Sequence, residues 1–485
     1  MKRTVKLAVL TGLIGFIWLP GQGQINNTIY HMSGIPQSNR VNPAFQPQSN
    51  LYIGFPLISQ LRAEAVSNSL DYSDVIYPHP FEDSLITFLH PLGDKEEFLN
   101  KLEPLNYLST DIRATLISAG FRTPAGFFSL DLSTRTDESF HYSGDLARFL
   151  FKGAQEGETY DLSGTGINAT AFDEVSVGWS YHLFDNLQVG ARAKLLFGIA
   201  DLSMESPELS LQTSQDVWDM EADMTVNASL PFAEVLYDQD GMIEDILVTD
   251  ELNQFDLFVL NRYLFNLRNP GFGIDMGISY RPIMPLQVSA SVLDLGFISW
   301  GDEVHRAEYQ GNYSFEGIEL NPFDLPEDVS LGDYLDSTFS QIGDTLSGFL
   351  EFSPGGNYRG RLNTKIYVGA SYDVTPYFNV GLLSRTDLLQ GSIAQRFTAS
   401  ANIRAGRIVH FSASYSTIGT RLHNIGTGIS FNFGPVNLYM VSDNALSVLL
   451  MPQETYAANI WFGLNLVFGY KNYSRPGYGD RPMIY

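Results

Sequence analysis

The stretch Asn459–Tyr470 reads NIWFGLNLVFGY, and its even-numbered positions carry nearly all of its large apolar side chains. These are Ile460, Phe462, Leu464, Leu466, Phe468 and Tyr470, and between them lie Asn459, Gly463 and Asn465. Successive side chains of a β-strand point to opposite faces, so this stretch predicts a strand with one apolar face and one small or polar face. An alternating strand of about 9–11 residues is typical of a transmembrane β-barrel.

The same alternation recurs along most of the chain. It covers Val175–His182, Leu187–Leu195, Ile274–Arg281, Gln287–Asp294, Asn363–Tyr372, Phe397–Arg404, Val409–Ser416 and Asn424–Phe433, and several connections, such as Gly434-Pro435, are very short. A soluble β-sandwich is the alternative, but its strands average roughly five or six residues. The longer strands favour an all-β, antiparallel transmembrane barrel over residues 51–470, with about 14 strands and a range of roughly 12 to 16.

The first residues predict export. Lys2 and Arg3 precede the apolar run Leu7–Leu19, and small residues follow at Gly21 and Gly23. This is the pattern of a secretory signal peptide over residues 1–23. A transmembrane anchor is the alternative, but it needs about 20 apolar residues. An exported barrel implies the cell outer membrane, with outer-membrane lipid as its surroundings.

Composition excludes several function classes. The chain has no Cys, which rules out a disulfide scaffold, a thiolate zinc site and a Cys nucleophile. The net charge of −25 argues against nucleic acid as a partner, because Lys and Arg bind phosphate backbones. No HExxH, GxSxG, P-loop or dinucleotide fingerprint is present. Asp238–Gly241 resembles a calcium loop only superficially, and an Asp-Gly turn explains it. We therefore expect no enzyme activity, no cofactor and no metal.

The negative charge is concentrated in two segments. Residues 203–256 contain 14 Asp or Glu and no Lys or Arg, and residues 321–353 contain 7 and again no base. Outer-membrane barrels have short turns on one side and long loops outside, so we expect extracellular loop insertions at 203–262 and 321–353. Helices are expected in these insertions at Phe255–Leu267 and Leu331–Leu350, and a third helix is expected at Gly144–Ala154.

Alternation also places a set of basic residues on the lumen face of the strands. They are Arg135, Arg192, Lys194, Arg281, Lys365 and Arg404. One interpretation is that they pair with inward acids such as Asp131, Glu174 and Asp275 and fill a wet interior. The other is a path for anions or carboxylates. The first is favoured, because opposite charges inside a barrel neutralise one another.

Residues 24–50, directly after the predicted signal peptide, cannot form a regular helix or ladder strand. Pro36, Pro43 and Pro47 each lack a backbone N–H, which removes a donor from either structure. Asn42 can bond backbone groups, and Phe45 can anchor among apolar groups of the lumen. These properties predict a plug folded inside the barrel. The alternative is a flexible periplasmic tail.

Here the chain resembles known families. The Asn42-Pro43-Ala44 element after the signal is similar to the hatch of FadL-type transporters of hydrophobic compounds and of the related PorV-like barrels. A closer resemblance is to an uncharacterised Bacteroidota family of outer-membrane barrels. The resemblance implies a 14-stranded barrel whose hatch contains Asn42, Pro43, Ala44 and, next to them, Phe45. Two features depart from it: the acidic insertions, and a C-terminal tail over residues 471–485.

Three functions follow from these observations. The first is passive transport of a hydrophobic or amphipathic small molecule. The alternative is a non-transporting barrel that serves as scaffold or accessory of a surface or secretion complex, with a protein partner. A barrel enzyme is disfavoured. An apolar lumen pocket with a lateral gap would favour transport, whereas a lumen sealed by ion pairs, with an exposed apolar loop surface, would favour the scaffold.

Overall fold

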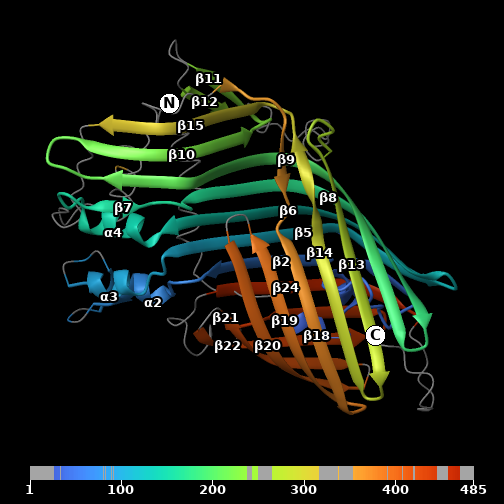
Figure 1. Cartoon of the computed structure of the whole chain (residues 1–485). Helices are drawn as coiled ribbons and strands as arrows, with labels where there is room; N and C mark the ends of the chain where they lie inside the picture. The colour runs from blue at the N-terminus through green and yellow to red at the C-terminus, as the bar shows by residue number, and fades with distance from the viewer. Residues whose placement is uncertain are drawn as a thin grey trace.

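The computed structural model describes residues 27–32, 34–79, 81, 83–88, 90, 92–237, 243–248, 265–315, 337, 353–389, 392–406, 408–418, 421–444 and 457–469. These residues form a closed antiparallel β-barrel of 14 strands, so the predicted fold class is confirmed (Figure 1). The predicted signal peptide, the predicted tail and most of the helices expected at Phe255–Leu267 and Leu331–Leu350 lie outside the described residues.

The first barrel strand is interrupted and consists of β1 (Leu51–Gly54) and β2 (Gln60–Ser67), which both pair with the same two neighbours. The other wall strands are β5 (Leu105–Thr123), β6 (Gly126–Ser143), β8 (Gly166–Phe184), β9 (Leu187–Gln212), β13 (Pro270–Ile283), β14 (Leu286–Trp300), β18 (Thr364–Thr375), β19 (Phe378–Leu389), β20 (Ser392–Ala405), β21 (Val409–Ile418), β22 (Arg421–Phe433), β23 (Val436–Ser442) and β24 (Ala457–Phe468). The strand β17 (Tyr358–Arg361) precedes β18 and also pairs with β14.

The barrel closes where the last strand meets the first. Leu51 of β1 lies opposite Phe468 of β24 on one side and opposite Phe121 of β5 on the other. The register continues through β2, whose Leu61 lies opposite Phe462 of β24. Closure leaves no free sheet edge in the wall, which is the condition for a sheet to exist in a membrane.

The alternation predicted for the last strand is confirmed. Ile460 and Phe468 are 48% and 42% exposed on the outside, whereas Asn459 and Asn465 are buried on the inside. Turns at one end of the barrel are short, as at residues 124–125, 185–186, 376–377 and 434–435. The opposite end, which we call the long-loop end, carries the long connections, as outer-membrane barrels do on their external side. No helix among the described residues is long and apolar enough to cross a membrane.

The long-loop end contains several small elements beyond the wall. These are α2 (Tyr72–Val75), β3 (Ile76–Pro78), β4 (Leu85–Thr87), α3 (Lys95–Asn100), α4 (Gly144–Lys152), β7 (Thr159–Asp161), β10 (Trp218–Ser229), β11 (Ala233–Tyr237), β12 (Ile243–Val248), β15 (Val304–Phe315) and β16 (Ser353–Pro354). In Figure 1 the helices α2, α3 and α4 lie on the same side as the projecting ends of β10 and β15. The helix predicted at Gly144–Ala154 is confirmed as α4, which Ser143 caps by accepting a hydrogen bond from the Leu146 N–H.

The first acidic insertion differs from the prediction of a loop with one helix. Much of it forms a sheet in which the distal half of β9 pairs with β10, and β10 pairs with β15. Trp218, Met220, Ala222 and Met224 are buried on one face of β10, in a cluster that includes Phe149 of α4. The acids between them lie on the other face. The acidic segment is therefore an amphipathic strand, because its apolar residues alternate with its acids.

The outer face of the wall presents large apolar side chains from strand to strand. Exposed examples are Val177 and Trp179 on β8, Leu195 on β9, Phe272 and Ile278 on β13, Val368 and Tyr372 on β18, Leu382 on β19, Phe397 on β20, Phe411 on β21 and Met440 on β23. Such a continuous apolar surface is larger than soluble monomers expose. It is the surface that we expect lipid to cover.

Two exposed valines on one strand test this expectation. Val368 lies in the middle of β18 and Val374 lies beside its short turn, and the two side chains are 56% and 51% exposed. An arginine near the bilayer midplane costs about 2–4 kcal/mol, but only about 0–1 kcal/mol near the interface. We therefore expect Val368→Arg to lower the free energy of unfolding in lipid vesicles far more than Val374→Arg, as measured by urea titration. Equal losses would contradict a lipid-facing wall.

Candidate functional site

The residues from Asn27 to Gln46, which we call the N-terminal segment, lie inside the barrel. They contain two short 3₁₀ helices, η1 (Thr28–His31) and η2 (Pro36–Arg40), and nearly all of the described side chains are buried. At one end the Asp443 carboxylate accepts hydrogen bonds from the backbone N–H groups of Asn27 and Thr28, at 2.7 and 2.6 Å. Near the other end Arg122 donates to the Pro47 carbonyl at 2.7 Å. Contacts with the wall therefore fix the segment at both ends.

Asn42, Pro43, Ala44 and Phe45, the residues of the predicted hatch, lie at the centre of this packing. The Asn42 amide donates to the backbone carbonyls of Ile278 and Ala290, at 3.3 and 3.2 Å, and its oxygen accepts from the Ala44 N–H at 2.9 Å. Phe45 is buried and meets the ring of Tyr30 edge to face. The position of these residues inside the barrel is a finding, whereas their role as a hatch stays a prediction.

Two glycines of the wall make room for these residues. A Cβ atom on Gly277 of β13 would lie 2.1 Å from the Asn42 side-chain oxygen, and one on Gly190 of β9 would lie 2.2 Å from the Pro43 carbonyl oxygen. Any larger residue at either position would collide with the segment. The wall and the segment are therefore complementary in shape at these two positions.

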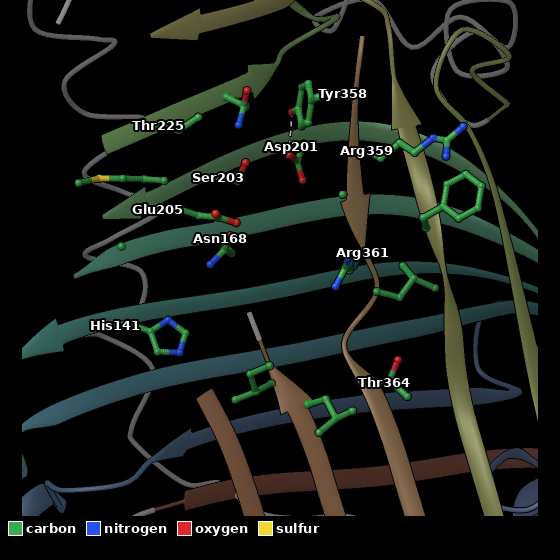
Figure 2. Close-up of a pocket in the computed structure, with 18 of the residues that line it drawn as sticks. His141, Asn168, Asp201, Ser203, Glu205, Thr225, Tyr358, Arg359, Arg361 and Thr364 are labelled. Atoms are coloured by element: carbon green, nitrogen blue, oxygen red, sulfur yellow. Dashed lines mark hydrogen bonds between the residues drawn. The ribbon is translucent and has the colours of Figure 1, made fainter. Parts of the chain in front are cut away.

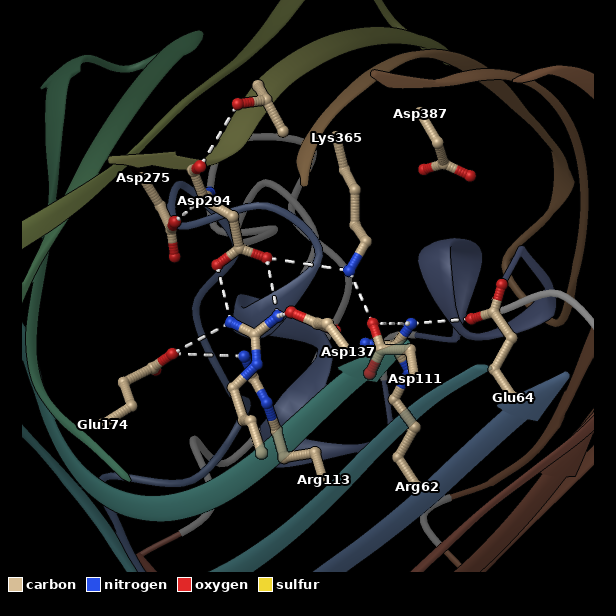
Figure 3. Close-up of polar contacts among 12 residues, drawn as sticks. Arg62, Glu64, Asp111, Arg113, Asp137, Glu174, Asp275, Asp294, Lys365 and Asp387 are labelled. Atoms are coloured by element: carbon tan, nitrogen blue, oxygen red, sulfur yellow. Dashed lines mark hydrogen bonds and ion pairs between the residues drawn. The ribbon is translucent and has the colours of Figure 1, made fainter. Parts of the chain in front are cut away.

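A layer of charged side chains crosses the lumen next to the N-terminal segment (Figure 3). We call it the ion-pair layer, and its members are Arg62, Glu64, Asp111, Arg113, Arg135, Asp137, Glu174, Arg192, Lys194, Asp275, Asp294, Lys365, Arg385, Asp387 and Arg396. They come from β2, β5, β6, β8, β9, β13, β14, β18, β19 and β20. All of them are buried, so each charge is compensated by others in the layer rather than by bulk water.

Arg135 lies at the centre of one half of the layer. Its guanidinium pairs with Asp294 at 2.9 Å, with Glu174 at 3.1 Å and with Asp137 at 3.2 Å. It also lies 4.9 Å from the centroid of the Phe172 ring. Lys365 links this half to the other, because its ammonium group contacts both Asp294 and Asp111.

The second half of the layer is built on Glu64 and Asp387. Glu64 pairs with Arg62 at 2.7 Å and with Arg385 at 3.3 Å. Asp387 pairs with Arg385 at 2.8 Å and with Arg396. Arg62 also reaches Asp111 at 3.2 Å, so the two halves form one continuous network.

The structure buries five of the six predicted lumen-facing bases inside the barrel, namely Arg135, Arg192, Lys194, Arg281 and Lys365. Arg404 is half-buried near the short-turn end of β20, opposite His410. Of the acids expected to pair with them, Glu174 contacts Arg135, and Asp275 contacts Arg192 and Lys194. Asp131 instead pairs with Arg40 of the N-terminal segment.

Sequence reasoning missed Asp294, which pairs with Arg135, Lys194 and Lys365 in the layer. Strict alternation from Gln287, Ser289 and Ser291 would place Asp294 on the outside of β14. A register irregularity between β13 and β14 interrupts the alternation there, and Asp294 takes a positive φ of 59°. This bulge turns its carboxylate inward. Arg385 and Asp387, also missed, keep the alternation of β19 and could have been found from it.

A cavity of about 1420 Å³ lies at the long-loop end, and we call it the long-loop cavity (Figure 2). Asn168, Ser203 and Asn227 line one wall at matching register positions of β8, β9 and β10. Its other lining residues include Asp201, Glu205, Phe297, Arg306, Tyr358, Arg359 and Arg361. The Tyr358 hydroxyl donates to Asp201 at 2.7 Å, and the Arg359 guanidinium lies 4.9 Å from the Phe297 ring centroid. The cavity thus combines charged, amide and aromatic surface.

The described residues contain no group of three or more His, Cys, Asp or Glu side chains arranged to hold a metal ion.

The sequence model described as "Family of unknown function (DUF5723)" matches residues 43–443. The chain belongs to this family. The match begins inside the N-terminal segment and covers most of the barrel. No protein with curated annotation matches the chain significantly. The Bacteroidota source and the PorV-like relationship stay predictions.

Solved structures with a similar arrangement include two toluene transporters and a FadL homologue. The Ralstonia pickettii toluene transporter TbuX has 10% identity and a TM-score of 0.40, with 93% of this chain and 100% of that chain covered. The Pseudomonas putida toluene transporter TodX has 8% identity and a TM-score of 0.36, with coverage of 92% and 94%. A Pseudomonas aeruginosa FadL homologue has 8% identity and a TM-score of 0.38, with coverage of 93% and 99%. Similarity at this level carries no argument about a ligand.

Two glycines on β13 provide a matched test of the contact between wall and segment. Gly277→Ala places a methyl group against Asn42 and Pro43, whereas a Cβ at Gly273 would have no neighbour closer than 3.4 Å. Overpacking costs about 1–3 kcal/mol, which is enough to displace the N-terminal segment from its position against β13. In a Phe45→Cys background, we expect Gly277→Ala to speed thiol labelling at least about tenfold. Gly273→Ala should leave the rate unchanged. Because the natural chain has no Cys, the added thiol is the only one.

Proposed function

We propose that this protein is an outer-membrane barrel that admits amphipathic small molecules at the long-loop end and passes them through a gated lumen without energy coupling. The observation that carries the proposal is the long-loop cavity. Its volume of about 1420 Å³ exceeds the roughly 300–1,000 Å³ of ordinary small-molecule pockets. It lies at the end of the barrel that carries the long connections, which face outward in barrels of this kind.

The lining of the cavity supports an amphipathic ligand. Leu295, Phe297 and Leu362 offer apolar contact, while Asn168 and Asp201 offer hydrogen-bond acceptors. The Asn168 side-chain oxygen is buried and has no partner among the described residues. An acceptor left in this way favours a ligand with a donor group, since a buried polar atom without a partner is costly.

Membrane residence is part of the same proposal. The apolar outer face supports contact with outer-membrane lipid. The closed wall has no sheet edge whose backbone N–H and C=O groups would lack hydrogen-bond partners in the lipid. The N-terminal segment and the ion-pair layer close the lumen. Passage of a ligand therefore requires the segment to move and the ion pairs to separate.

The closed lumen also favours a second function, a non-transporting barrel that serves as a scaffold for a surface or secretion complex. Cavities of only about 20 Å³ occur within the ion-pair layer, each with room for about one water molecule. On the outside of the long-loop end, Phe81 is 83% exposed, and Leu85 and Leu92 are also exposed. Such apolar groups on a loop surface would suit a protein partner.

Blocking the cavity distinguishes the two functions. Ser203→Trp fills the cavity, whereas Ser314→Trp adds the same side chain to an exposed position of β15 in the same sheet. After gentle extraction from native membranes, we expect mass spectrometry to detect a co-purified small molecule with the natural protein and with Ser314→Trp, and at least about tenfold less with Ser203→Trp.

Recovery of a stoichiometric protein partner, with no small molecule that depends on Ser203, would instead contradict transport. That result would establish the scaffold function.

A further inference from the structure

The wall strands β6 and β14 show the same order of contacts from the short turns to the long loops. On β6, Asp131 and Ser133 contact Arg40 of the N-terminal segment, at 2.8 and 3.4 Å. Arg135 follows in the ion-pair layer, and His141 lines the long-loop cavity. The segment, the layer and the cavity are therefore stacked along the barrel axis in this order.

The same order holds on β14, which lies beyond β8, β9 and β13 around the wall. Ser289 shares a hydrogen bond with the Tyr30 hydroxyl at 3.0 Å, and Ser291 donates to the Val41 carbonyl at 2.6 Å. Asp294 then enters the layer, and Gly296 lines the cavity. The layer thus separates the cavity from the segment on both of these strands.

We propose that the ion-pair layer is a second barrier, in series with the N-terminal segment, and that removal of the segment alone leaves the lumen closed. This inference rests on the proposed function for its purpose, since a barrier matters only if solutes pass. The barrier itself can be tested apart from that function, because the test concerns which part of the lumen excludes ions and water.

The contacts of the charged residues at the centre of the ion-pair layer indicate that the layer does not depend on the N-terminal segment. The ion-pair partners of Arg135 are Asp137, Glu174 and Asp294, which all belong to wall strands. Lys365 likewise pairs with the wall residues Asp111 and Asp294. Loss of the segment would therefore leave these pairs in place.

Contacts between the layer and the segment lie at the edge of the network. Arg192 donates to the Asn39 carbonyl at 3.1 Å while it also pairs with Asp275 at 3.2 Å. Without the segment, Arg192 would keep its carboxylate partner. The wall strands that carry the layer also hold it in position, because each of them pairs with a neighbouring strand on both sides.

Ion conductance in planar lipid bilayers tests the inference with four proteins. They are the mature chain, the chain without residues 24–48, the chain with Arg135→Ser and Lys365→Ser, and the chain with both changes. We expect the first three to show only a baseline current in potassium chloride. The fourth should conduct at least about tenfold more, because both barriers are then removed. A mobility shift between boiled and unboiled samples checks that each barrel is folded.

Adding Ser289→Cys to the fourth protein shows where the current flows. Ser289 lies below the layer and faces the space that the segment leaves. A charged maleimide should then reduce the current at least about twofold if ions pass through the lumen. If the double serine variant does not fold, Lys365→Ser alone removes the link between the two halves of the layer and replaces it in the design.

A current in the segment-deleted chain equal to that of the combined variant would overturn the inference, because the segment would then be the whole barrier. A baseline current in the folded combined variant would also overturn it. Neither result depends on the small molecule retained in the cavity, so failure of the inference is distinguishable from failure of the proposed transport function.

Discussion

Pairing of β24 with the interrupted first strand is the constraint on which the rest of the structure depends. It closes the sheet, so every wall strand has two neighbours, and one face of each strand points into the lumen. Inward side chains then have no access to bulk water except through the two ends of the barrel. The polar residues of the interior must therefore satisfy one another, and the N-terminal segment and the ion-pair layer are the two ways in which they do so.

The wall could be predicted from sequence because its signal is local. Alternation in Asn459–Tyr470 depends only on strand geometry, and the structure follows it from Asn459 to Phe468. The same logic placed Arg135 and Lys365 inside. It failed at Asp294, where one bulge reverses the face, because a bulge depends on pairing with β13 rather than on the sequence of β14 alone. Partners such as Asp294 and Lys365 are far apart in the sequence, so alternation predicts their orientation but not their contact.

The acidic segment after Ser203 shows a different kind of error. Its acids alone predict a solvated loop, whereas the apolar residues between them predict a strand. Met220, Ala222 and Met224 alternate with Glu221 and Asp223, which is the pattern used to find the wall strands. The spacing of the apolar residues, rather than the charge of the acids, therefore indicates the structure of this segment. The long-loop cavity could not be predicted at all, because it depends on how β10 and β17 lie relative to β9 and β14.

The chemistry of the ion-pair layer bears on why a barrel would be closed by charges. Buried ion pairs seldom add stability, since the cost of removing two charges from water offsets most of their attraction. An apolar filling would close the lumen at least as firmly. It could not open toward water at low cost, because apolar surface would then be exposed. Separated ion pairs, in contrast, recover hydration when water enters. A charged layer is therefore suited to a closure that opens, whereas an apolar core is suited to one that does not.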